Sequence, residues 1–164
     1  MKSKQVVAHR EAGFRFVVTS GSGHEVIVDD GVGDTGARPT ELVLVALAAC
    51  TGMDVISILE KKRQDVTDYS VVVEGVQREE RPDVFVRATI VHTVTGRDID
   101  RAAVHRAVQL SAHKYCPVSA MLSAGTVEVR HRFLIVDADH AKPDQAGEVI
   151  VLGPRASADP VPAV

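Results

Sequence analysis

The pattern of apolar positions is most distinctive in one long segment, residues 40–63. This segment is rich in Ala and Leu and contains a single glycine, Gly52, which is typical of a buried helix. Pro39 stands at its first turn, where the missing N–H of a proline is not needed. The segment closes on Lys-Lys-Arg at 61–63, and cations favour the negative end of a helix dipole. We therefore predict a long helix over residues 40–63.

Strand patterns lie on both sides of this helix. The short runs Arg15–Thr19 and His24–Asp29 are joined by Ser-Gly-Ser-Gly and predict a hairpin. The longer runs Ser70–Arg78 and Val84–Thr95 are joined through a Pro-Asp turn and predict a second hairpin. A further strand is expected over Thr126–Val136.

Two shorter helices are expected between the second hairpin and the last strand. Asp98 or Asp100 is placed to cap a helix that runs to about Ala112. Pro117 then opens a short helix that ends near residue 125, with Cys116 at its N-cap. Runs of strands and helices in this order are typical of the α+β class.

The chain length indicates one domain with a short tail. A chain of 164 residues and 17.6 kDa supports a single core. Four of its seven prolines stand at 143, 154, 160 and 162. We therefore expect a domain over residues 1–136 and a loose tail over 137–164, with room for one short strand at Glu148–Leu152.

Composition and charge exclude several classes of partner. The net charge of -3, from 19 basic and 22 acidic residues, offers no electrostatic footprint for nucleic acid. The longest uncharged apolar run, Leu42–Met53, is shorter than the roughly 20 residues of a membrane span. No apolar stretch follows the basic N-terminal residues, as it would in a secretion signal. We therefore predict a cytoplasmic protein without nucleic-acid or membrane partners.

Cysteine chemistry is the main candidate for function. In the cytosol, Cys50 and Cys116 are expected to be free thiols or a transient redox pair rather than a structural disulfide. Cys50 lies in the middle of the long helix, and Asp54 follows it one turn later on the same face. Cys50 is either a small buried side chain or a reactive thiolate that needs a nearby cation. Asp54 either acts on the thiol or bonds an arginine or a backbone group.

Cys116 lies in a different setting. His113 and Lys114 precede it, and both a basic pair and a helix start lower the pKa of a thiol. Its other interpretation is a plain cap residue. The histidines form no HxxxH pattern and the cysteines no CxxC, so we predict no metal site. No glycine pattern of a nucleotide site is present either, so we expect no cofactor.

Two motifs make the sequence recognisable as a pair. Residues 39–55, Pro-Thr-Glu-Leu-Val-Leu-Val-Ala-Leu-Ala-Ala-Cys-Thr-Gly-Met-Asp-Val, resemble the helix of the OsmC/Ohr family that carries its first active cysteine. Residues 115–119, Tyr-Cys-Pro-Val-Ser, resemble its second cysteine motif, 66 residues on (116 minus 50). The resemblance covers about residues 15–136. It implies an intertwined α+β homodimer in which antiparallel sheets wrap two long central helices, with active sites at the subunit interface.

The resemblance also implies an activity, the thiol-dependent reduction of organic hydroperoxides or hydrogen peroxide. Cys50 would be the thiolate that attacks the peroxide, and Cys116 the thiol that closes a disulfide with it. The implied partners are a small hydroperoxide substrate and an external dithiol reductant. The alternative is a redox-sensing or small-ligand-binding protein of the same fold with little peroxidase turnover.

One part of the family pattern is replaced in this chain. The peroxidases of the family carry a glutamate ten residues before the first cysteine, bonded to an arginine that holds the thiolate. Here that position is Thr40, and Glu41 lies on the opposite helix face. Arg15, in a segment similar to the family's Gly-Gly-Arg, and Arg38, before the helix, are the two candidates for the arginine. Asp54 is the candidate to orient it in place of the glutamate.

Overall fold

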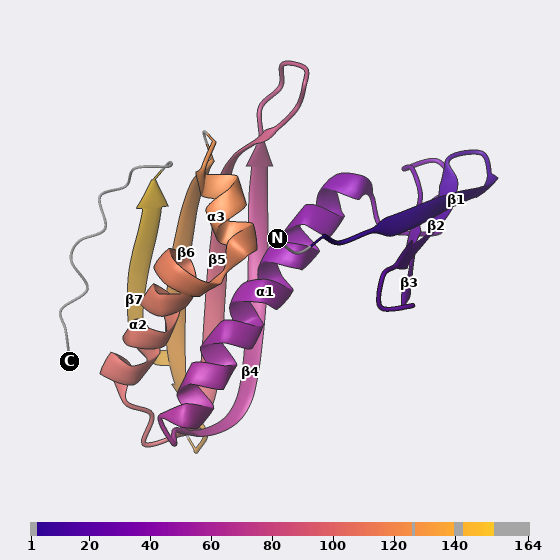
Figure 1. The fold of residues 1–164 in the computed structure, drawn as a ribbon. Helices are drawn as coiled ribbons and strands as arrows, with labels where there is room; N and C mark the ends of the chain where they lie inside the picture. The colour runs from indigo at the N-terminus through magenta and orange to yellow at the C-terminus, as the bar shows by residue number, and fades with distance from the viewer. Residues whose placement is uncertain (1–2, 126, 140–142, 153–164) are drawn as a thin grey trace. The chain divides into compact units, whose positions relative to one another are not determined.

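The computed structural model describes residues 3–125, 127–139 and 143–152. The chain divides into two compact units, Met1–Val45 and Ala46–Val164. Two β-sheets and three α-helices make up the described residues (Figure 1), and the α+β class predicted from the sequence is confirmed.

The N-terminal unit contains a three-stranded antiparallel sheet in the order β1-β2-β3. Its strands are β1 (Val6–Ala12), β2 (Arg15–Ser20) and β3 (Glu25–Val28). The β2–β3 hairpin is the one that the sequence predicted, whereas β1 was not predicted. Gly13 closes the turn between β1 and β2 with a φ of 54°, a conformation that glycine adopts without steric cost.

The long helix α1 (Pro39–Lys61) matches the predicted segment closely. Its start is fixed by its own side chains, because the backbone N–H of Arg38 donates to Glu41 Oε2 at 2.9 Å. This is the glutamate half of a capping box, and it satisfies a backbone donor that the helix leaves unpaired. Glu41 is therefore engaged at the helix terminus.

The second unit is built on a four-stranded sheet in the order β4-β5-β6-β7. Its strands are β4 (Asp65–Gln77), β5 (Phe85–Arg97), β6 (Glu128–Asp137) and β7 (Pro143–Leu152). The hairpins β4–β5 and β6–β7 are antiparallel, whereas β5 and β6 pair in parallel. The expectation of purely antiparallel sheets is thus wrong for this pair. A helical connection between β5 and β6 carries the chain back to the starting end of the sheet, and parallel strands need such a crossover.

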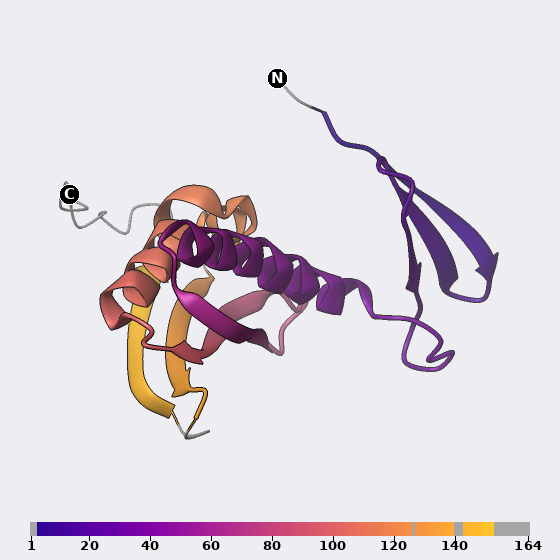
Figure 2. The same cartoon turned by 90° about the horizontal axis from the view of Figure 1, so that it is seen from below.

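That connection consists of α2 (Arg101–Leu110), a π-helical turn η1 (Ser111–Tyr115) and α3 (Pro117–Ser123). Asp100, rather than Asp98, caps α2, and its side chain accepts from the N–H of Ala102 at 2.8 Å. Cys116 is the N-cap of α3, as predicted. Figures 1 and 2 show α2, α3 and the C-terminal part of α1 on the same face of the four-stranded sheet.

The hydrophobic core of this unit lies between the three helices and that sheet. Apolar side chains from all of these layers are fully or almost fully buried there, among them Leu47, Val55, Leu59, Val104, Val108, Ile90, Val94, Val129 and Phe133. Other apolar residues of α1 stay exposed, including Ala46, Ala49 and Met53. Their spacing places them on one stripe of the helix, on the side away from the buried residues.

Strand β7 differs from the expectation of a loose tail. The strand allowed for at Glu148–Leu152 extends to Pro143–Leu152 and pairs with β6 along its length. Val149 and Val151 are buried in the core. The sheet therefore continues past the expected domain boundary at residue 136, and the rest of the predicted tail, residues 153–164, lies outside the described residues.

Candidate functional site

The two cysteines lie next to each other although 65 residues separate them in the chain. Cys50, in the middle of α1, is half-buried, and Cys116, at the start of α3, is buried. Their sulfur atoms and a carboxylate oxygen of Asp54 all lie within 4.8 Å of one another. Both cysteines are free thiols. The structure therefore brings together three of the five site residues predicted from the sequence.

Local backbone structure fixes the position of Cys116. The N–H of Ser119 donates to Cys116 Sγ at 3.3 Å, so the thiol acts as the capping group of α3. The N–H of Cys116 itself donates to the carbonyl of Ser111 at 3.0 Å, which closes the π-helical turn η1. Two hydrogen bonds thus hold this cysteine where its sulfur faces Cys50.

Burial controls the protonation of Cys116. Burial, followed by a hydrogen bond with Cys50, raises the pKa of the Cys116 thiol to about 12. This result corrects the expectation that His113 and Lys114 lower that pKa. The ammonium of Lys114 lies over the Tyr115 ring, 5.5 Å from its centroid. At neutral pH, Cys116 is therefore a protonated thiol that shares a hydrogen bond with Cys50.

Asp54 is held by a hydroxyl group. Ser111 Oγ donates to Asp54 Oδ2 at 3.0 Å and also shares a hydrogen bond of 2.9 Å with Thr51 Oγ1. Among the described residues, no ion pair includes Asp54. Sequence analysis missed Ser111 and Thr51, because nothing in the local pattern shows that η1 packs against α1.

A chain of buried polar side chains continues behind Cys116. Ser119 Oγ lies 3.4 Å from His131 Nε2, and His131 Nδ1 lies 3.4 Å from His92 Nε2. His92 Nδ1 lies 2.7 Å from the hydroxyl of Tyr69. The two imidazole rings are stacked with an interplanar angle of 8°. This row of polar side chains runs from β4 through β5 and β6 to the first turn of α3. Its only trace in the sequence is two histidines among apolar strand residues.

The two buried histidines, His92 and His131, are neutral. Burial lowers the pKa of His92 to about 4. Burial, with smaller contributions from His92 and His113, lowers the pKa of His131 to about 3. Burial and then the charge of Asp54 raise the pKa of Tyr69, so its phenol stays protonated. These buried side chains are therefore all uncharged at neutral pH.

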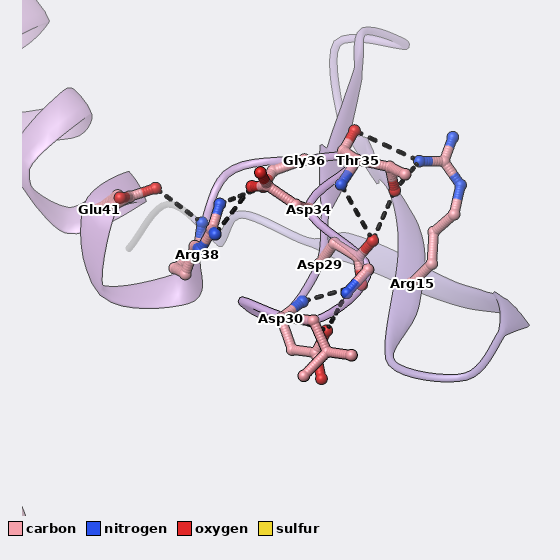
Figure 3. A network of polar contacts seen from close by, with 10 residues as sticks. Arg15, Asp29, Asp30, Asp34, Thr35, Gly36, Arg38 and Glu41 are labelled. Atoms are coloured by element: carbon pink, nitrogen blue, oxygen red, sulfur yellow. Dashed lines mark hydrogen bonds and ion pairs between the residues drawn. The ribbon is translucent and has the colours of Figure 1, made fainter.

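The two candidate arginines belong to a polar network of the N-terminal unit (Figure 3). Arg15 donates from Nη1 to Thr35 Oγ1 at 2.6 Å (Figure 3). Its Nε also donates to Glu11 at 2.7 Å. Thr35 in turn donates to the buried carboxylate of Asp29, and this bond is the main cause that lowers the pKa of Asp29. Arg15 thus helps to order the loop before α1.

Arg38 belongs to the same loop. Its guanidinium pairs with Asp34 at 2.8 Å and donates to the carbonyl of Gly36 at 3.3 Å (Figure 3). The pairing with Asp34 is the main cause that raises the pKa of Arg38. A role for Arg15 or Arg38 beside Cys50 stays a prediction.

A pocket of about 380 Å³ adjoins Asp54 in the second unit. It is formed by residues of α1, by Leu110 at the end of α2 and by Tyr115 at the end of η1. Its walls are largely apolar and consist of Met53, Asp54, Ser57, Ile58, Lys61, Leu110 and Tyr115. A small molecule with an apolar tail fits such a lining.

The α+β fold and the dithiol define a class of protein, and comparison with known proteins identifies it. The model of the family described as OsmC-like protein matches residues 31–132. This match covers both cysteines and most of the chain. The chain belongs to the OsmC-like family, as the resemblance of its two cysteine motifs indicated.

Individual relatives agree with this assignment. Protein YhfA of Escherichia coli strain K12 is 44% identical over 126 residues, which are 77% of this chain and 93% of YhfA. A hypothetical protein from Aquifex aeolicus VF5 has a solved structure with a TM-score of 0.74 at 30% identity, covering 84% of this chain and 98% of that one. The organic hydroperoxide resistance protein OhrB of Bacillus subtilis has a TM-score of 0.54 at 22% identity, covering 80% of this chain and 98% of that one. The likeness to OhrB is one of fold alone.

Proposed function

We propose that this protein reduces organic hydroperoxides with the Cys50–Cys116 dithiol. The observation that carries the proposal is the contact between the two thiols, with a half-buried Cys50 and a buried Cys116. A dithiol of this kind can donate two electrons to a peroxide and is thereby oxidised to a disulfide. Family membership supports the same reaction, because structural relatives include organic hydroperoxide resistance proteins.

Cys50 is the attacking residue in this proposal. It is the more accessible of the two cysteines, and its sulfur lies within 4.8 Å of the Cys116 sulfur. The thiolate attacks one peroxide oxygen, the O–O bond breaks, and the released alkoxide takes a proton to become an alcohol. Cys50 is thereby oxidised to a sulfenic acid.

Cys116 completes the reaction. Its sulfur attacks the sulfenic sulfur of Cys50, the S–O bond breaks, and the hydroxide leaves as water with the thiol proton of Cys116. The product is a Cys50–Cys116 disulfide, which an external dithiol reduces back to two thiols. No metal or organic cofactor takes part in this cycle.

The pocket beside Asp54 supports an organic substrate over hydrogen peroxide. Its wall of Met53, Ile58 and Leu110 offers apolar contact to an alkyl or aryl group. The pocket also includes Asp54, which lies one helical turn after Cys50 on α1. The cation that would hold the thiolate is Arg15 or Arg38, and Asp54 would orient it. The protein would act as a homodimer through the exposed apolar stripe of α1.

A second candidate is redox sensing or ligand binding with little turnover. The observation that favours it is the pKa of Cys116, because a thiol with a pKa of about 12 forms little thiolate at neutral pH and attacks a sulfenic acid slowly. Thr40, in place of the family's glutamate, points the same way. A sensor would oxidise at Cys50 and remain oxidised.

Rapid mixing of the reduced protein with cumene hydroperoxide tests the proposal. We expect oxidation at least 100-fold faster than that of free cysteine at the same pH, and catalytic turnover with an added dithiol. A rate no faster than that of free cysteine would exclude the peroxidase. Fast oxidation followed by no turnover would favour the sensor.

Two variants assign the roles of the cysteines. Cys50→Ser should abolish peroxide consumption, whereas Cys116→Ser should consume one equivalent and stop at a sulfenic acid that a dimedone-type reagent traps. Sulfenic acid at Cys116 in the Cys50→Ser protein, with peroxide still consumed, would reverse the assignment. Arg15→Ala and Arg38→Ala, compared with each other, show which guanidinium accelerates the first step.

A further inference from the structure

We infer that the reduced protein binds one Zn²⁺ ion per chain through Cys50, Cys116 and Asp54. These three side chains form a compact donor set of two sulfurs and one carboxylate oxygen. The site does not depend on peroxidase activity, because it requires the reduced dithiol and no turnover. Short ligand spacings in the sequence do not indicate this site, because Cys116 lies more than 60 residues after Asp54.

The donor atoms lie near enough to one another to converge on a single zinc ion. With bond lengths of about 2.0–2.3 Å, two ligands of a tetrahedral zinc ion lie roughly 3.3–3.8 Å apart. The three donor atoms here all lie within 4.8 Å of one another. Side-chain rotations that shorten the separation between donors by at most about 1.5 Å therefore bring them to zinc-binding distances.

All three donors are carried by helices or helix caps. Cys50 and Asp54 are four residues apart on α1, a spacing that places two ligands on one face of a helix. Cys116 is fixed at the cap of α3 by two backbone hydrogen bonds. The ion would therefore bridge α1 and α3 through side chains that already lie close together.

Hydrogen bonds outside the donor set prepare the ligands. Ser111 donates to one oxygen of Asp54, and the N–H of Ser119 donates to the sulfur of Cys116. Such partners orient metal ligands and stabilise their negative charge. Each bond leaves lone pairs on its acceptor free for the ion.

Charge in the site favours a divalent cation. Among the described residues, Asp54 lacks a cationic partner, yet it lies against two thiols that become negative when they bind a metal. Thiolate ligands select soft ions such as Zn²⁺ over Mg²⁺ or Ca²⁺. Three protein ligands leave the fourth tetrahedral position open to water.

Zinc binding is measured by competition with a chromophoric chelator, using Zn²⁺ alone and the dithiol-reduced full chain. We expect one ion per chain, and X-ray absorption should show two sulfur ligands at about 2.3 Å. Cys50→Ser and Cys116→Ser should each weaken binding at least 100-fold. Wild-type protein oxidised with diamide should bind no zinc, a control that needs no substitution.

Asp54→Asn separates this three-residue site from a bare dithiol. The amide oxygen can still accept from Ser111, so the fold is retained, while binding should weaken at least tenfold. Asp68→Asn, at an exposed position on β4, is the matched control and should leave binding unchanged. Unchanged affinity in Asp54→Asn, or binding that survives Cys116→Ser, would overturn the inference.

Discussion

At the scale of single residues, Cys116 shows burial outweighing local charge. Two basic residues precede this cysteine and a helix follows it, and both features lower the pKa of an exposed thiol. The structure buries the sulfur against Cys50, and its pKa rises to about 12. The sequence shows the neighbours along the chain but not the loss of water around the sulfur.

Cys50→Ala tests which cause dominates. The substitution removes the hydrogen bond and the charge of Cys50, while burial remains. We expect the pKa of Cys116 to fall below about 12 but to stay above the ordinary value of 9.0, since burial is the largest cause. The pH profile of Cys116 alkylation by iodoacetamide, followed by mass spectrometry, measures it. An alkylation midpoint below 9 would contradict this ordering.

The buried pair His92 and His131 predicts acid sensitivity. Their pKa values in the folded protein, about 4 and about 3, lie below the ordinary value of 6.5. Between about pH 3 and pH 6.5 these histidines bind more protons in the unfolded chain than in the folded one, so the free energy of unfolding falls as pH falls. Stability is fully present above about pH 6.5, and we expect a loss of a few kcal/mol by pH 5. Urea unfolding at pH 7.5, 6 and 5 measures this loss.

The double variant His92→Leu/His131→Leu is the control for this prediction. It replaces both members of the pair with apolar side chains of similar size, so no buried imidazole loses its partner within the pair. Its stability between pH 7.5 and 5 should change much less than that of the wild type. An equally steep pH dependence would assign the acid sensitivity to other groups.

At the scale of elements, regular periodicity made most of the fold predictable. The apolar helix α1, the β2–β3 and β4–β5 hairpins and the cap of α3 all follow from short sequence patterns. Strand β1 was not predicted, because it is exposed along its whole length and shows no apolar alternation. The parallel pairing of β5 with β6 escaped because register between distant strands is set by packing across the core.

The candidate site was predictable to the same degree. Helical spacing alone placed Asp54 on the face of Cys50, and family resemblance paired Cys50 with Cys116. The partners Ser111 and His131 come from segments whose contacts depend on how η1 and β6 pack, which no local pattern encodes. Polar residues that act through long-range contacts are therefore the part of this site that sequence analysis could not supply.

Strand β7 yields a prediction about truncation. A chain that ends after Val136 lacks this strand, leaves the edge of β6 unpaired and exposes core side chains that Val149 and Val151 cover. We expect this truncation to aggregate or to lose at least about 3 kcal/mol of unfolding free energy, given about 1.5 kcal/mol or more for each buried valine. A chain ending after Leu152 is the matched control. Equal urea midpoints for the two chains would show that β7 is dispensable.

At the scale of the whole molecule, the apolar character of α1 exceeds what one chain buries. By length and composition this helix could cross a membrane, a test that core helices of soluble proteins also pass. Only 28% of its most apolar window is buried within the chain. A second copy of the same helix is an apolar partner of matching shape, and we expect it to cover this surface.

We therefore predict a homodimer at micromolar concentration. Light scattering coupled to size-exclusion chromatography should give a mass twice that of one 17.6 kDa chain. Met53→Lys places a charge on the exposed stripe of α1 and should raise the dimer dissociation constant at least tenfold. Lys61→Ala, at the end of the same helix, is the control. A monodisperse monomer of the wild type would contradict the prediction.

The parallel pairing of β5 and β6 also sets an order of events in folding. The β4–β5 and β6–β7 hairpins close short loops, whereas the parallel pair must close a loop that contains residues 98–127. We expect contacts of such long separation to form after the local hairpins, because closing the longer loop costs more chain entropy. Cys116 lies inside that loop, so its thiol stays open to reagents until the final docking step. During synthesis and refolding, the cysteine that is most protected in the native protein is therefore exposed until close to the end.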